Sequence, residues 1–205
     1  EEARERDKFY ATILFTSLGI PMVFQGQEFG LQTGWNDDNN NGDYEEKLQY
    51  RPIDWALLET DVGQSHLDHY SRLARFRKTN PAFSRGIFYD LWRYEGERVI
   101  VYGYKDESEG NNNDQVVVIA NFSSSDRMVN DVPFLSAGNW YNVTNPGNDL
   151  YTADGNYGEY SIPSKSAVVY SKNQYELGVE TPSFVPEKFQ TLSAYPNPFN
   201  PSITL

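Results

Sequence analysis

The stretch from Gly19 to Gly30, with the sequence GIPMVFQGQEFG, is the most informative part of this chain. Its residues 22–25 (Met-Val-Phe-Gln) form a short apolar run without polar alternation, which is typical of a strand buried on both faces of a parallel sheet. Pro21 prevents a preceding helix from continuing, and Gly26 permits a sharp turn after the run. The pattern therefore predicts one buried strand closed by a tight turn.

Helices are predicted on both sides of this strand. Residues 1–18 carry apolar side chains at helical spacing, and residues 64–79 repeat that pattern until Pro81 prevents continuation. A helix, a tight turn and a buried strand together form half of an α/β repeat. We therefore expect residues 1–86 to be α/β in character.

From residue 87 onwards the apolar pattern changes from helical to strand-like. Short β-type runs occur at residues 99–102, 116–120, 128–129 and 167–170. Clusters of Gly, Asn and Asp separate such runs at intervals of roughly 8–12 residues, which is typical of an all-β sandwich. We therefore expect an antiparallel β-sandwich over residues 87–172.

The composition excludes several classes of function. The formal net charge is −12, and a surface this acidic repels phosphate backbones, so we expect no nucleic-acid partner. The absence of cysteine excludes thiolate metal sites and cysteine nucleophiles. No apolar run approaches the roughly 20 residues that a transmembrane helix needs. Aromatic residues make up 15% of the chain, which suits either strand packing or sugar stacking, and we favour packing.

The stretch at residues 19–30 resembles the last barrel strand of the α-amylase family (glycoside hydrolase family 13). In that family a Gly-x-Pro turn leads into a strand that ends near Gly-x-Glu. The Leu-Phe-Thr-Ser-Leu run at 14–18 resembles the helix before that strand, and residues 77–83 (Arg-Lys-Thr-Asn-Pro-Ala-Phe) resemble the end of the final barrel helix. Residues 118–123 (Val-Ile-Ala-Asn-Phe-Ser) resemble part of the family's domain C. The resemblance covers residues 1–172. It implies the last β/α segment of a (β/α)₈ TIM barrel, followed by an antiparallel β-sandwich domain C.

The same resemblance implies hydrolysis of α-1,4-glucans such as starch, with retention. Retaining glycosidases need two carboxylates about 5–5.5 Å apart. The resemblance places these, with a third carboxylate, on earlier barrel strands, so we expect them upstream of residue 1 and assign no catalytic residue here. Since the sequence opens at Glu1 without a Met, we interpret the chain as a C-terminal fragment of a longer enzyme, inactive alone.

Three polar residues follow the predicted strand directly. In a (β/α)₈ barrel the reacting groups lie on loops after the C-terminal ends of the strands. We therefore expect Gln25, Gln27 and Glu28 at the rim of the active site. These side chains can bind sugar hydroxyls or support neighbouring catalytic loops, and we favour support for Glu28. Trp35 is a fourth rim candidate, because its indole can stack on a pyranose ring or pack beneath its own loop, and both readings stay open.

The pattern Asp37-x-Asn39-x-Asn41-Gly matches the first half of an EF-hand calcium loop. The twelfth position is Leu48, where such a loop needs a bidentate Glu. We therefore interpret the segment as a solvated loop and keep Asp37, Asn39 and Asn41 as weak calcium-ligand candidates.

His66 and His69 lie three residues apart on the second predicted helix. Without a third ligand nearby, we interpret them as surface residues rather than as a metal pair. The expected chemistry requires no cofactor. The resemblance leaves a structural calcium ion open, with ligands that the sequence does not identify.

The C-terminal segment carries a second resemblance. Residues 173–191 contain scattered prolines and charges and are interpreted as a linker. Residues 194–202 (Ala-Tyr-Pro-Asn-Pro-Phe-Asn-Pro-Ser) resemble the opening of C-terminal sorting domains of bacterial type IX secretion. This implies a truncated Ig-like domain over residues 192–205, contact with the secretion machinery, and a product that is secreted or attached to the cell surface after outer-membrane export. The alternative is a simple proline-rich linker.

Two other functions are considered beside hydrolysis of an α-glucan polysaccharide. A Trp-Asn pair at Trp35 and an Asp-Trp pair at Trp55 are similar to pairs in glycogen branching enzymes, so a 1,4-α-glucan branching transglycosylase is the first alternative. Secretion argues against it. The second is a non-catalytic carbohydrate-binding β module, which the strand pattern at 22–25 and its flanking helices argue against.

Overall fold

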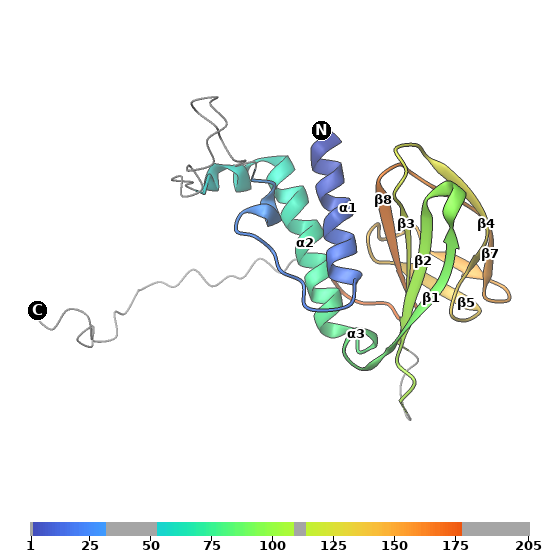
Figure 1. Ribbon diagram of the computed structural model, residues 1–205. Helices are drawn as coiled ribbons and strands as arrows, with labels where there is room; N and C mark the ends of the chain where they lie inside the picture. Colours follow the sequence, from blue (N-terminus) through green and yellow to red (C-terminus); the bar gives the residue numbers. More distant parts are fainter. Residues whose placement is uncertain (1, 32–52, 109–113, 178–205) are drawn as a thin grey trace, which may run out of the picture.

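The structure is a computed structural model that describes residues 2–31, 53–108 and 114–177 (Figure 1). Helices α1 (Glu2–Thr16) and α2 (Asp61–Thr79) lie side by side and pack against one face of a six-stranded sheet. A two-stranded sheet covers the other face. The described chain therefore forms three layers, with the helices on one side and β structure on the other.

The predicted helices are confirmed, with shifted ends. Helix α2 begins at Asp61 because the Thr60 hydroxyl accepts a hydrogen bond from the Gly63 N–H at 3.0 Å, which caps the first turn. Short helical turns connect the larger elements. They are η1 (Gln27–Phe29), η3 (Trp55–Glu59), α3 (Ala82–Arg85) and η4 (Glu95–Glu97).

The antiparallel β-sandwich expected after residue 87 is also confirmed. Its strands are β1 (Ile87–Tyr94), β2 (Val99–Lys105), β3 (Gln115–Asn121), β4 (Arg127–Pro133), β5 (Gly138–Asn142), β6 (Leu150–Thr152), β7 (Asn156–Ile162) and β8 (Ser166–Ser171). The larger sheet has the order β1-β2-β3-β8-β5-β6, and β4 pairs with β7. All these pairings are antiparallel.

Strand β3 shows why the layers hold together, because every one of its residues is buried. Val116 and Val118 belong to the core between the sheet and the helices. Val117 and Ile119 point the other way, into a second core under β4 and β7 that also holds Trp140. Alternating side chains of one central strand thus join both cores.

The strand predicted at residues 22–25 is not formed among the described residues. Those residues have no strand pairing, and Met22 and Phe24 are 82% and 66% exposed. A strand needs hydrogen-bonding neighbours on its edges, and every described strand pairs elsewhere. The parallel sheet expected around this run is likewise not present in the described part of the chain.

Candidate functional site

The turn that follows the apolar run, residues 25–30, is the centre of the predicted site. Gly26 and Gly30 adopt left-handed φ angles of 83° and 76°, one on each side of η1. A Cβ on Gly26 would lie 2.5 Å from the Leu31 side chain, so only glycine fits there. The Leu31 N–H donates to the Gly26 carbonyl oxygen at 2.9 Å. The two glycines therefore fold the chain back sharply, as the sequence predicts for Gly26.

The three polar residues of this turn have different surroundings. The Gln27 Oε1 accepts a hydrogen bond from the Phe24 N–H at 3.3 Å, so this side chain supports its own turn. Gln25 is exposed, while Glu28 is half-buried and its Oε2 atom has no hydrogen-bond partner among the described residues. Gln25 and Glu28 line the same cavity of about 340 Å³. The other residues around it are Phe15, Val23, Leu67, Tyr70, Ser71 and Ala74.

This cavity is mainly apolar, and Glu28 brings a carboxylate to its wall. A buried carboxylate oxygen without a hydrogen-bond partner costs free energy in an apolar setting. The cavity lies between the turn and the helices α1 and α2.

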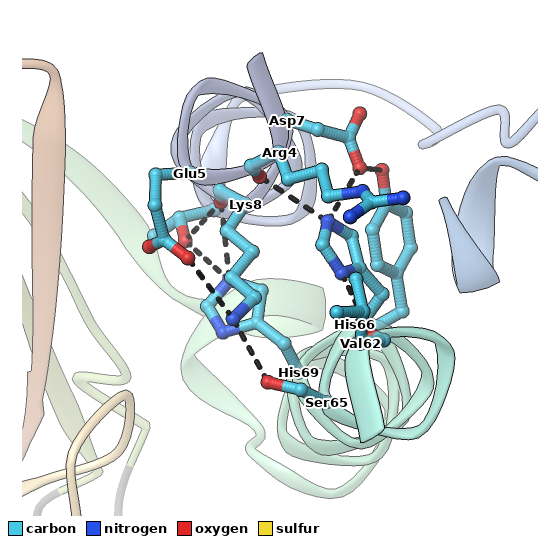
Figure 2. A network of polar contacts seen from close by, with 10 residues as sticks. Arg4, Glu5, Asp7, Lys8, Val62, Ser65, His66 and His69 are labelled. Carbon is cyan, nitrogen blue, oxygen red and sulfur yellow. Dashed lines mark hydrogen bonds and ion pairs between the residues drawn. The ribbon is translucent and has the colours of Figure 1, made fainter. Parts of the chain in front are cut away.

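A polar network joins α1 to α2 behind the turn (Figure 2). His66 is 1% exposed, and its ring nitrogens lie 3.0 Å from the Val62 carbonyl oxygen and 3.2 Å from that of Arg4. Asp7 Oδ2 accepts a hydrogen bond from the Tyr70 hydroxyl at 3.0 Å and lies 3.9 Å from His66 Nε2. The interpretation of His66 as a surface residue is therefore wrong, because it packs between the helices.

His69 belongs to the same interface, one turn further along α2. Its Nε2 lies 3.0 Å from the Thr12 hydroxyl oxygen and 3.1 Å from the Lys8 carbonyl oxygen. Burial lowers the pKa of His69 to about 4, and the positive charges of Lys8 and Arg72 act in the same direction. Burial also raises the pKa of Tyr70, helped by the Asp7 carboxylate. Both side chains are therefore neutral at pH 7 and hold the helices together.

The remaining site candidates lie outside the described residues. Trp35 and the calcium-ligand candidates Asp37, Asn39 and Asn41 stay predictions. Within the described residues, no cluster of three or more His, Asp or Glu side chains is arranged to hold a metal ion. None of the helices in the described ranges has the length and hydropathy required to cross a bilayer.

No family model matches the chain. It is 28% identical over 139 residues to a pullulanase of Bacillus subtilis (strain 168), a match that covers 64% of this chain and 18% of the pullulanase. It is 23% identical over 186 residues to a 1,4-alpha-glucan branching enzyme of Butyrivibrio fibrisolvens, covering 87% of this chain and 26% of that enzyme. The chain thus spans only a fifth to a quarter of the length of these curated relatives.

Solved structures agree with these relatives. The chain matches AmyP in complex with maltose with a TM-score of 0.60 and 17% identity, over 83% of this chain and 35% of that one. It matches a pullulanase from Bacillus acidopullulyticus with a TM-score of 0.56 and 18% identity, over 84% and 21% of the two chains. The fold is that of the C-terminal domains of α-amylase-family structures.

An α-amylase from Geobacillus thermoleovorans, complexed with acarbose, matches with a TM-score of 0.54 and 20% identity, over 82% of this chain and 33% of that one. The α-amylase-family fold includes both the helical layer and the β-sandwich, because each of these matches covers more than four fifths of the chain. The similarity is to enzymes acting on α-glucans, which agrees with the family resemblance seen in the sequence.

Proposed function

We propose that this chain is the C-terminal part of a secreted glycoside hydrolase that cleaves α-1,4-glucosidic bonds of starch-like polymers with retention. In this proposal residues 1–86 supply the last β/α segment of a (β/α)₈ barrel, and residues 87–172 form domain C. The similarity to a pullulanase and to a branching enzyme supports an enzyme of this family. The catalytic carboxylates belong to earlier barrel strands, so the 205-residue chain alone is inactive.

The observation that carries this proposal is the alternation of exposure in residues 20–24. Ile20, Met22 and Phe24 are 96%, 82% and 66% exposed. Between them, Pro21 and Val23 are partly buried, and Val23 packs against the core of the helices. The run therefore has strand-like alternation, with one side on the helices and three large apolar side chains on the other.

Such a run fits a barrel strand. The strands of a (β/α)₈ barrel carry helices on the outside and a packed apolar core on the inside. Three large apolar side chains on one side of a five-residue run form an exposed apolar patch of the kind that marks a contact surface. The inward side of a barrel would bury them, and the adjoining turn with Gln25 and Glu28 would then stand at the C-terminal end of the strand.

The decisive experiment measures the products that the full-length protein forms from amylose. We expect reducing ends to rise with time, and we expect the first product observed by NMR to carry the α-anomeric configuration, as retention requires. Production of the β-anomer first would contradict retention. A full-length protein that leaves amylose, starch and pullulan unchanged would contradict the function itself.

A branching transglycosylase is the second candidate. The match to a branching enzyme covers 87% of this chain, against 64% for the pullulanase. In the same amylose assay a branching enzyme forms α-1,6 branches without a matching rise in reducing ends. A non-catalytic binding module is disfavoured, because a match over 186 residues necessarily includes most of the helical part.

Export is proposed from residues 194–202, which lie outside the described residues. The resemblance of this segment to type IX sorting domains supports a protein that is secreted or attached to the cell surface. Deletion of residues 192–205 should prevent the enzyme from crossing the outer membrane of its natural host. Unchanged activity in the culture medium would contradict this route.

A further inference from the structure

Two tryptophan side chains of the described residues, Trp55 and Trp92, are exposed to solvent. Trp55 is 62% exposed and Trp92 on β1 is at 56%, whereas Trp140 is fully buried. An exposed indole presents a large, flat apolar face on which a ligand ring can stack. Trp55 contacts Phe29 of the turn that follows residues 20–24, and Trp92 belongs to β1. Strand β1 and this turn lie on opposite sides of the helices α1 and α2 (Figure 1).

The Trp55 ring packs against the ring of Phe29. Its ring centroid lies 5.8 Å from that of Phe29, with 32° between the two planes, so the rings are closer to parallel than to perpendicular. Phe29 is only 2% exposed and belongs to η1, the helical turn inside residues 25–30. The buried Phe29 ring therefore contacts the indole, which remains 62% exposed.

The backbone at Trp55 is held in place as well. Trp55 is the first residue of η3, and the Asp54 side chain caps this helix by accepting a hydrogen bond from the Ala56 N–H at 3.2 Å. The exposed Asp54 carboxylate thus lies next to the indole in the sequence and keeps further lone pairs for a hydroxyl donor. A flat apolar face beside a hydrogen-bond acceptor matches a pyranose ring, which has C–H groups on its faces and hydroxyls at its edge.

We propose that Trp55 is a stacking platform for one glucosyl unit of the polymer, at the rim of the active site and away from the bond that is cleaved. This inference rests on the proposed function, which puts the turn with Phe29 at the C-terminal end of a barrel strand, on the side where substrate binds. Trp55 determines preference for long chains over short ones and takes no part in the chemical step.

Trp92 is less suited to this role and provides a matched control. Its ring stands at 61° to that of Tyr94, with 6.2 Å between centroids, so this neighbouring ring does not stack parallel to it. It lies on edge strand β1, which the two helices separate from η3. Removal of Trp92 therefore tests the general effect of deleting an exposed tryptophan.

The test compares Trp55→Ala, Trp55→Phe and Trp92→Ala in the full-length protein, with amylose and with a chromogenic maltotrioside as substrates. For Trp55→Ala we expect kcat/KM on amylose to fall about tenfold through KM, the size of loss typical of one well-placed aromatic contact. On the short maltotrioside kcat/KM should stay within about twofold. Trp55→Phe should restore most of the loss, because it keeps an aromatic face, and Trp92→Ala should behave as wild type.

The outcomes separate the two proposals. A wild-type protein without activity on either substrate overturns the proposed function, and this inference with it. An active wild type with unchanged amylose KM in Trp55→Ala overturns the platform alone. Equal losses on both substrates that Trp55→Phe does not restore, together with a lowered Tm, show that Trp55 only packs the turn. An equal loss in Trp92→Ala also overturns a specific role for Trp55.

Discussion

Two short apolar runs of this chain have the same sequence character and opposite structural outcomes. Val116 to Ala120 in β3 are all 0% exposed, with β2 and β8 paired on either side. Met22 and Phe24, in the other run, are 82% and 66% exposed and have no strand pairing among the described residues. An apolar run therefore becomes a strand only where neighbouring strands supply hydrogen bonds and other elements cover its faces.

The two runs share one side and differ on the other. Val116, Val118 and Val23 all contact the same core, which the helices α1 and α2 build. On its other side β3 is covered by β4 and β7, around Trp140. The opposite side of residues 20–24 has no such cover within the described structure.

The largest expected effect comes from removing the cover of β3. Trp140→Ala should destabilise the chain by about 3–5 kcal/mol, because it opens a cavity in a fully buried site and removes the hydrogen bond from the indole N–H to the Ser136 carbonyl oxygen. Urea unfolding measures this change. Trp92→Ala, at an exposed position, should cost less than about 1 kcal/mol. Similar losses of unfolding free energy in Trp140→Ala and Trp92→Ala would mean that Trp140 is not buried in the core between the two sheets.

The stability of the helix pair α1 and α2, against which both runs pack, should depend on pH through His69. Its folded-state pKa of about 4 lies below the ordinary value of 6.5, so between these values the unfolded chain binds the proton more tightly. Stability should therefore fall as the pH is lowered from about 6.5 to 4, by on the order of 3 kcal/mol. His69→Gln should flatten this part of the curve in pH-dependent urea unfolding. If the free energy of unfolding of His69→Gln still falls equally over this pH range, other titratable groups cause the effect.

The turn after the exposed run should tolerate no side chain at Gly26. Gly26→Ala should cost about 2 kcal/mol, from its positive φ and from the clash with Leu31. Gly19 also has a positive φ, 102°, but nothing lies within 4 Å of an added Cβ. Gly19→Ala should therefore cost only about 1 kcal/mol, the strain alone. Thermal unfolding of both variants separates clash from strain.

The smallest effect in the 205-residue chain is the sharpest test of the comparison. Phe24→Ala should change the free energy of unfolding by less than about 0.5 kcal/mol here, because Phe24 is exposed. In the full-length protein the same change should cost about 2–5 kcal/mol, since a barrel interior would bury the ring. Equal small effects in both proteins would remove the reason for placing residues 20–24 in a barrel.

Part of the candidate site was predictable and part was not. The position of Gln25, Gln27 and Glu28 on a turn after an apolar run follows from local residue order. The contact of Tyr70 with Asp7 joins residues 63 positions apart, and local sequence patterns do not predict a contact over this distance. The burial of His66 was missed for the same reason.

Periodicity and end signals in the sequence were enough to place the two long helices and the strands β2, β3 and β8, because these depend on neighbours within a few residues. Only the tertiary structure decided that β8 lies between β3 and β5, that Trp140 is buried while Trp55 is exposed, and that residues 22–25 stay unpaired in the described chain. Strand pairing and burial arise from contacts between distant segments, and a short apolar run is compatible with several partners.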